Sequence, residues 1–301
     1  MKLALKVDVD TLAGTRVGVP ELLRLFDRHG VRATFLFSLG PDHTGRAVRR
    51  IFRRGFFQKV RRTSVVSHYG WRTLLYGTLL PGPDIGRRAA DVMRSVAAAG
   101  HEVGVHCFDH VLWQDRVAGA DAEWTRRQID LACARFTEIF GRPAAVHGAA
   151  GWQMNPSAYR AEREAGFFYA SDTRGRRPYW PVIDGAPIAC LQLPTTLPTL
   201  DELIGRDDLP EATPVATLTA ATERGIETGH VFTLHAEIEG GLLRDTFDVL
   251  LSNWRAQGYE LGTLEESVLA LDRAKAPNCL AAYGTVPGRS GQVAVQGEEA
   301  G

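Results

Sequence analysis

Val103-Gly104-Val105-His106-Cys107-Phe108-Asp109-His110 is the stretch that decides the fold, because an apolar strand pattern runs here directly into two histidines four residues apart. Each imidazole carries a nitrogen that can bind a divalent metal. Taken alone, such a pair is more often two surface or capping histidines. A second cluster, Asp8 and Asp10 at the end of the N-terminal strand pattern, favours the metal interpretation.

The N-terminal strand pattern covers residues 3–9, where apolar and polar residues alternate. Because the side chains of a strand point alternately to its two faces, Asp8 and Asp10 share one face. A Gly/Thr loop follows, and then an amphipathic helix pattern over residues 19–29 that ends at Gly30. If this strand and the histidine strand lie in one parallel sheet, two carboxylates meet two imidazoles at its edge.

Strand and helix patterns alternate through the rest of the chain. Strand patterns lie at 32–39, 144–149, 167–171, 187–193, 230–234 and 259–262, and helix patterns at 85–99, 121–140, 155–165, 217–228, 242–257 and 264–274. The alternation predicts an α/β fold with a parallel sheet, and a length of 301 residues favours a closed (β/α) barrel over an open doubly wound sheet. No G-x-G-x-x-G follows the first strand, which counts against a dinucleotide-binding fold.

One domain is expected over residues 1–275, and the Gly-rich, weakly patterned residues 276–301 are expected to be loosely packed or disordered. Residues 43–82 form an insertion after the second strand, in which Arg and Lys are interleaved with Phe, Trp and Leu. Its composition fits a solvated basic loop and a membrane-surface segment equally well, and a nucleic-acid arm is the third interpretation. The formal net charge of zero gives no general reason to expect nucleic acid.

The cysteines and the N-terminus indicate the compartment. Cys107, Cys133, Cys190 and Cys279 form no C-x-x-C pair, which argues against a disulfide framework and fits a reducing environment. The apolar stretch at residues 3–9 is too short for a signal peptide, and no run of about twenty apolar residues could span a membrane. A cytoplasmic protein is expected, which leaves peripheral contact with a membrane open.

Asp10, His106 and His110 make a set of two histidines and one carboxylate. Three protein ligands leave a position open for water, as in catalytic metal sites. One divalent metal ion is therefore expected, and zinc, manganese and cobalt all suit the mixed N/O ligands. Asp8 is placed to accept a proton from the attacking water. His235, at the end of a late strand pattern, is the candidate acid that protonates the departing nitrogen of an amide.

Asp8-x-Asp10, His106-x3-His110 and Thr233-Leu234-His235 resemble, in order and spacing, the motifs of the polysaccharide deacetylase family, the NodB-like carbohydrate esterases. The resemblance covers about residues 3–265 and implies a distorted (β/α) barrel. It also implies the roles given above: Asp8 as base, His235 as acid, and the other three residues as metal ligands.

One departure from the family pattern concerns the base. The family usually carries an Arg-x-Pro-x-Gly motif whose arginine steadies the base, whereas residues 147–152 here contain neither Arg nor Pro. Arg174 is expected to take over that task. The candidate substrate-binding residues, all near predicted strand ends, are Trp152, Asp172, Arg174, Thr195 and Glu237.

Residues 69–71, 193–199 and 235–240 make the chain similar to one branch of the family. That branch removes an N-formyl group from a polyprenyl-phosphate-linked amino sugar at the cytoplasmic face of the inner membrane, for lipid A modification and polymyxin resistance. The resemblance implies that lipid as the substrate, peripheral membrane contact, and neither nucleic acid nor an obligate protein partner. The alternatives are an N-deacetylase of an amino sugar or peptidoglycan fragment, and an inactive metal- or lipid-binding relative. Intact Asp8 and His235 favour an enzyme.

Overall fold

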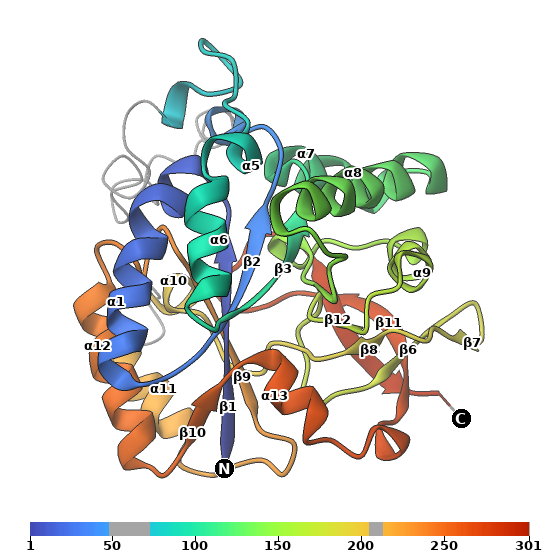
Figure 1. Cartoon of the computed structure of the whole chain (residues 1–301). Coiled ribbons are helices and arrows are strands. Elements are labelled where there is room, and N and C mark those ends of the chain that lie inside the picture. Colours follow the sequence, from blue (N-terminus) through green and yellow to red (C-terminus); the bar gives the residue numbers. More distant parts are fainter. Residues whose placement is uncertain (48–72, 205–212, 301) are drawn as a thin grey trace.

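The fold is built on an eight-stranded parallel sheet that curls into a distorted barrel (Figure 1). The computed structural model describes residues 1–47, 73–204 and 213–300. The strands run in the order β10-β1-β2-β3-β4-β5-β8, and β9 also pairs with β1. Their bounds are β1 Lys2–Val9, β2 Thr34–Ser38, β3 Glu102–Cys107, β4 Val146–His147, β5 Tyr169–Ala170, β8 Leu191–Gln192, β9 His230–His235 and β10 Glu260–Gly262.

Strand β1 is the centre of the sheet. It pairs with β2 through residues 6–9, with β9 through residues 3–8 and with β10 through residues 2–4. Residues 3–9 are buried on both faces, as expected for a parallel strand that is covered by helices outside and by side chains inside. The register places Asp8 beside His235, so the proposed base and acid lie at the same end of neighbouring strands.

The barrel closes between β8 and β9 without a regular strand ladder. The backbone N–H groups of Thr196 and Leu197, which follow β8, donate to the carbonyl of Val231 in β9 at 3.1 and 3.3 Å. An apolar layer fills the interior below the site, with Ala4, Leu36, Val146, Tyr169, Leu191 and Val231 contributed by different strands. The fold expected from the sequence, a distorted (β/α) barrel, is confirmed.

Helices surround the sheet, and consecutive neighbours in the ring are α11–α12, α12–α1, α1–α6, α6–α8 and α8–α9. Their bounds are α1 Val19–His29, α5 Ile85–Arg88, α6 Ala90–Ala98, α7 His110–Arg116, α8 Ala122–Phe140, α9 Pro156–Ala165, α10 Leu200–Leu203, α11 Pro214–Ala221, α12 Arg244–Ala256 and α13 Leu264–Leu269. The single helix expected over 85–99 is broken at Ala89, whose backbone is not helical. Helix α7 was not predicted, and it carries His110 at its first position.

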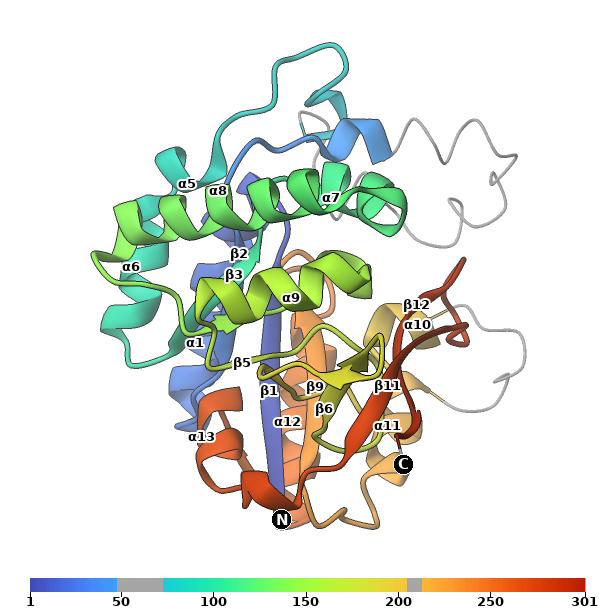
Figure 2. The same ribbon diagram turned by 90° about the vertical axis from the view of Figure 1, so that its right-hand side faces the viewer.

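A second sheet, which the sequence did not predict, lies against the barrel. Its order is β12-β11-β6-β7, with bounds β6 Trp180–Ile183, β7 Ala186–Pro187, β11 Asn278–Gly284 and β12 Val293–Glu299. The antiparallel pair β11–β12 runs alongside β6 (Figure 2). The expectation of a loosely packed or disordered segment at 276–301 is therefore wrong for residues 276–300. Burial of Cys279, Val293 and Ala294 against the barrel orders this hairpin.

Two further expectations concern membranes. Within the residues that the structure describes, no helix is long and apolar enough to cross a bilayer. Most of the basic and aromatic insertion at 43–82 lies outside the described residues, because the description stops at 47 and resumes at 73. Within the described part of the insertion, residues 73–80 project from the side of the molecule to which the ends of β2 and β3 point (Figure 1).

Candidate metal centre and active site

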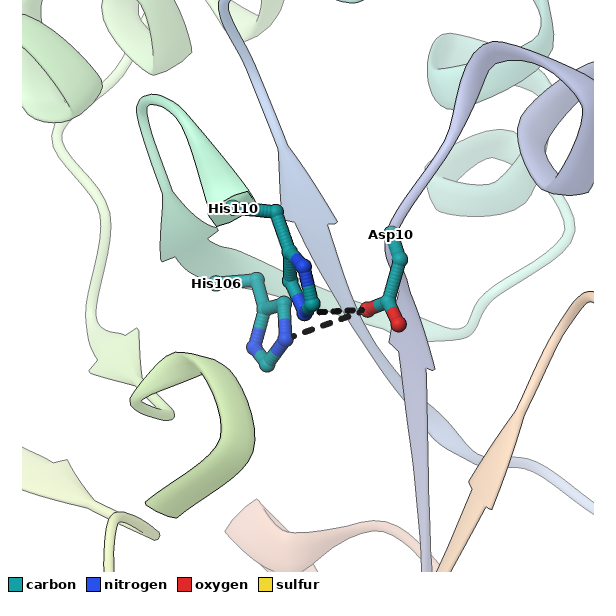
Figure 3. Close-up of side chains that lie close together, drawn as sticks. All are labelled: Asp10, His106 and His110. Atoms are coloured by element: carbon teal, nitrogen blue, oxygen red, sulfur yellow. Dashed lines mark ion pairs between the residues drawn. The ribbon is translucent and has the colours of Figure 1, made fainter. Parts of the chain in front are cut away.

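Asp10, His106 and His110 converge at the carboxyl ends of β1 and β3 (Figure 3). Asp10 directly follows β1, His106 lies in β3 and His110 begins α7. Asp10 Oδ1 is 3.2 Å from His106 Nε2 and 3.3 Å from His110 Nε2. One ligand atom from each residue lies within 4.8 Å of the other two. The sequence predicted this convergence from strand ends alone.

The donor set fits a divalent cation. His106 Nδ1 lies 2.6 Å from the carbonyl oxygen of Gly148, and a carbonyl only accepts, so Nδ1 carries a proton and, in the neutral ring, Nε2 carries the lone pair. Burial lowers the pKa of His110, which favours its neutral form as well. Asp10 Oδ1 is buried and makes no hydrogen bond within the described residues. Lone pairs of Asp10, His106 and His110 that face one another in a buried site repel unless a cation lies between them.

The turn after β3 sets the position of His110. Asp109 caps helix α7, because its Oδ1 accepts from the backbone N–H of Leu112 at 3.0 Å. Its other oxygen lies 2.6 Å from Nδ1 of His43. The cap starts the helix at His110 and thereby turns this imidazole back toward His106, with ring centroids 5.4 Å apart. A strand followed by a capped helix is thus what brings two histidines four residues apart onto one centre.

Asp8 and His235 flank the candidate metal ligands. Asp8 Oδ1 lies 3.9 Å from Nδ1 of His106 and, within the described residues, is buried without a hydrogen-bond partner. His235 Nδ1 lies 3.9 Å from Asp201 Oδ1. Burial alone would lower the pKa of His235, but the negative charges of Asp201, Asp10 and Asp8 raise it to about 9. These charges favour the protonated form of His235, the state that an acid requires.

Comparison with known proteins identifies the family. No protein-family model matches the chain. A protein of Shewanella sediminis (strain HAW-EB3) that carries the name 4-deoxy-4-formamido-L-arabinose-phosphoundecaprenol deformylase, ArnD, is 37% identical over 259 residues, which are 86% of this chain and 83% of that protein. A protein of Wigglesworthia glossinidia brevipalpis with the same name is 30% identical over 287 residues, 94% of this chain and 98% of that one. The chain belongs to this deformylase family. The resemblance inferred from the motifs is thereby confirmed.

Solved structures confirm the fold of this family member. A Mycobacterium smegmatis protein described as a polysaccharide deacetylase matches with a TM-score of 0.64 at 17% identity, over 95% of this chain and 94% of that one. A family 4 acetyl xylan esterase from Clostridium thermocellum, solved in complex with a cobalt ion, matches with a TM-score of 0.50 at 16% identity, over 89% and 91%. At these identities the likeness concerns the fold, and it agrees with the barrel described above.

Glu237 holds the loop that carries Asp10 in this deformylase family member. Its Oε1 accepts from the backbone N–H of Asp10 at 3.1 Å, and from the N–H and hydroxyl of Thr11 at 2.8 Å each. Burial and the neighbouring charge of Asp10 raise the pKa of Glu237 to about 8. Glu239, two residues later, accepts from the backbone N–H of His235 at 2.8 Å. Both side chains therefore support catalytic candidates, and contact of Glu237 with substrate stays a prediction.

Asp172 lies in a buried network behind the site. Asp172 Oδ1 lies 2.9 Å from Nδ1 of His147, and Glu162 Oε1 lies 2.7 Å from the same nitrogen. Gln192 donates to Asp172 Oδ2 at 2.7 Å. Asp172 also accepts from the backbone N–H of Ala149 at 2.7 Å. The network thus fixes the turn whose Gly148 carbonyl orients His106. Such a fully buried side chain supports the site from behind, and its contact with substrate stays a prediction.

Trp152, Thr195 and Arg174 lie together on the side of the barrel that faces β12. The buried Trp152 donates from Nε1 to Thr195 Oγ1 at 3.2 Å, and the guanidinium of Arg174 lies 5.0 Å from its ring centre. Arg174 binds Glu202 at 2.6 Å and the carbonyl of Leu197 at 2.9 Å. The expectation that Arg174 steadies Asp8 is therefore wrong, because its guanidinium is taken by other partners. Substrate contact by the three residues stays a prediction.

Four site residues were missed by the sequence reasoning: Lys6, Asp201, Glu202 and Arg289. Lys6 carried a detectable signal, because it stands on the same strand face as Asp8 and is a charged residue in an otherwise buried strand. Asp201 and Glu202 lie in α10, a four-residue helix too short for a periodic pattern. Arg289, whose Nε donates to Glu202 at 2.7 Å, lies in the hairpin that was expected to be loosely packed or disordered, so nothing in the sequence linked it to the site.

Proposed function

We propose that this chain removes the N-formyl group from undecaprenyl-phosphate-linked 4-deoxy-4-formamido-L-arabinose, with the aid of one divalent metal ion. The product is the 4-amino sugar lipid used for lipid A modification and polymyxin resistance. The chain belongs to a family of amide hydrolases, and the names of its relatives specify this substrate. The observation that carries the proposal is the gathering of Asp10, His106 and His110 beside Asp8 and His235 in a member of that family.

Asp10, His106 and His110 would hold the metal. A divalent ion bound there would lower the pKa of a bound water molecule toward about 7 and would polarise the amide carbonyl. Zinc, manganese and cobalt all suit a mixed N/O set. Glu237 and the carbonyl of Gly148 support the set, since one holds the Asp10 loop and the other fixes the His106 tautomer.

Asp8 and His235 would handle the protons. Asp8 Oδ1, buried and without a hydrogen bond among the described residues, is available to accept a proton as water adds to the formyl carbon. His235, whose protonated form the nearby carboxylates favour, would donate a proton to the sugar nitrogen as the carbon–nitrogen bond breaks. Formate and a free amine result. Each proton transfer contributes typically about 10²- to 10⁴-fold to the rate.

Peripheral association with the cytoplasmic face of the inner membrane is part of the same proposal. A polyprenyl lipid remains in the bilayer, so the enzyme has to reach it there. In the projecting segment at 73–80, Leu79 is 80% exposed and Leu80 is 37% exposed. Large apolar side chains beside a basic stretch are typical of segments that lie in a membrane interface.

Hydrolysis of matched lipid-linked sugars tests the proposal. Purified protein loaded with metal is incubated with the N-formyl and N-acetyl forms of the lipid together, and formate and acetate are followed. Formate should appear faster by about 10- to 200-fold, because closing a pocket against one methyl discriminates by about 1–3 kcal/mol. Acetate release at an equal rate would favour the N-deacetylase alternative. Absence of both products would favour an inactive relative.

A further inference from the structure

A fully buried lysine lies inside the barrel next to the proposed base. Lys6 belongs to β1 and is 0% exposed. It points to the same side of the strand as Ala4 below it and Asp8 above it. Ala4 belongs to the apolar layer that fills the barrel interior. Burying an ammonium group is costly unless it is paired and hydrogen-bonded, so the partners of Lys6 explain why it is there.

Three groups surround the ammonium of Lys6. Its Nζ donates to the carbonyl of Ser171 at 2.7 Å and lies 3.6 Å from Asp8 Oδ2. The ring of Trp152 lies 5.4 Å away, within range of a cation–π interaction. Ser171 and Trp152 are neutral, so Asp8 is the carboxylate that balances this charge. The two oxygens of Asp8 thus differ, since Oδ2 faces Lys6 and Oδ1 has no hydrogen-bond partner among the described residues.

The turn at residues 147–152 leaves room for the lysine. A Cβ at Gly148 would lie 3.3 Å from Lys6 Nζ and 2.3 Å from Leu36 Cδ1, so a larger residue there would force both side chains to move. This turn is where the sequence departs from the deacetylase pattern by lacking Arg and Pro. The ammonium of Lys6, which belongs to the same strand as Asp8, therefore reaches Asp8 through the space next to Gly148.

We propose that Lys6 is the positioning residue of the base: its ammonium holds Asp8 Oδ2, so that Oδ1 is presented to the attacking water. The inference rests on the proposed amide hydrolysis. The opposing interpretation is that Lys6 only ties β1 to the carbonyl of Ser171. The two interpretations differ in the group through which Lys6 acts. A structural tie acts through the hydrogen bond to Ser171, whereas a positioning residue acts through Asp8.

Substitutions at Lys6 separate these roles. Lys6→Met removes charge and donor, Lys6→Gln keeps a hydrogen-bond donor without the charge, and Lys6→Arg keeps the charge. Lys2→Met, at the half-buried start of the same strand, is the matched control. With full metal content, Met and Gln variants should lose about 100-fold in kcat, the cost of misplacing a catalytic group, with KM within threefold of wild type. Lys6→Arg should retain the larger share of kcat, and Lys2→Met should equal wild type.

A double-mutant cycle with Asp8→Asn gives the decisive comparison. If Lys6 acts through Asp8, Lys6→Gln should lower the residual rate of Asp8→Asn by less than threefold. A further 100-fold loss in that background, or a wild-type kcat in Lys6→Gln alone, would overturn the proposal. Should Lys6→Met fail to fold, Lys6→Gln carries the test. Any amide that the wild-type protein hydrolyses can serve as substrate, so failure on the formamido lipid contradicts the proposed function and leaves this inference testable.

Discussion

At the residue scale, His106 is the proposed metal ligand with the most restricted geometry, because the carbonyl of Gly148 holds one ring nitrogen and leaves the other beside Asp10. His106→Ala removes one of three protein donors, so we expect the purified variant to lose its divalent metal. Elemental analysis per chain measures this. His29→Ala, which alters a histidine paired with Asp248, should keep the wild-type metal content. Full metal in His106→Ala would remove this residue from the ligand set.

Variants of the proposed acid and base should behave differently from variants of the proposed metal ligands. Asp8→Asn and His235→Ala each remove a proton-transfer group and no metal donor, so metal content and the circular dichroism spectrum should stay as in wild type. Turnover should fall by about 10²- to 10⁴-fold in each variant. Rates of formate release at saturating substrate measure the loss. Near wild-type turnover in either variant would show that its assigned role is wrong.

At the element scale, the contact among β4, β5 and α9 depends on protonation. Burial alone would lower the pKa of His147, but the charges of Asp172 and Glu162 raise it from 6.5 to about 10. The folded chain therefore binds this proton more tightly than the unfolded chain. The stability that it contributes is complete below pH 6.5 and is lost as pH rises toward 10. Burial also raises the pKa of Glu162, which acts in the same direction.

Denaturant unfolding across that range tests the network. The free energy of unfolding of wild type should fall between pH 6.5 and 10, the window given by His147. His147→Gln should be less stable at pH 6.5 by about 3–5 kcal/mol, the usual cost of breaking a buried ion pair, and its stability should depend less on pH. Parallel pH curves for the two proteins would show that His147 is not charged in the folded state.

The hairpin of β11 and β12 contributes Arg289 to the site. Its Nε donates to Glu202 at 2.7 Å, and a terminal nitrogen lies 3.7 Å from Asp201, the residue beside His235. Arg289→Gln should lower kcat by about tenfold, because Asp201 loses one of the charges that hold it. The melting temperature should change little, since Glu202 keeps its pairing with Arg174 in this variant. Arg177→Gln, an exposed arginine paired with Glu299, is the control and should keep full activity.

At the scale of the whole molecule, the charge distribution bears on membrane contact. Residues 43–88 hold eleven Lys and Arg and one acid, while the chain as a whole has zero formal net charge. Each basic residue near an anionic surface contributes about 1 kcal/mol. The protein should therefore sediment with anionic vesicles at low salt and be released at high salt. Neutral vesicles serve as the control. Failure to bind anionic vesicles at low salt would leave the insertion as a solvated loop.

Much of the fold could be predicted, because buried parallel strands and amphipathic helices carry strong periodic signals. The alternation of apolar and polar residues predicted the position of β1, and the histidine pair predicted where β3 ends. The metal and proton-transfer candidates followed, since the ends of parallel strands in a barrel meet at one face. Helix α7 escaped prediction because its pattern begins within the histidine motif itself.

The contacts that the sequence did not predict depend on which side chains come close together in the folded chain. Arg174 and Lys6 were both available cations, and only the packed structure shows that Glu202 takes the first and Asp8 the second. The second sheet was missed for a related reason. Its hairpin buries only a few of its residues, among them Cys279, Val293 and Ala294, and it also pairs with β6, a four-residue strand that has no alternating pattern.

The pairing of β1 with β9 and β10 has a consequence for biosynthesis. Strand β1 carries Asp8 and is followed directly by Asp10, yet its neighbours β9 and β10 end only at His235 and Gly262. A nascent chain must therefore keep an apolar strand unpaired along one edge during most of its translation. Contacts between residues so far apart in sequence form slowly and expose the chain to aggregation meanwhile. Assembly of the proposed base and acid is thus a late event, and chaperone demand should be concentrated on β1.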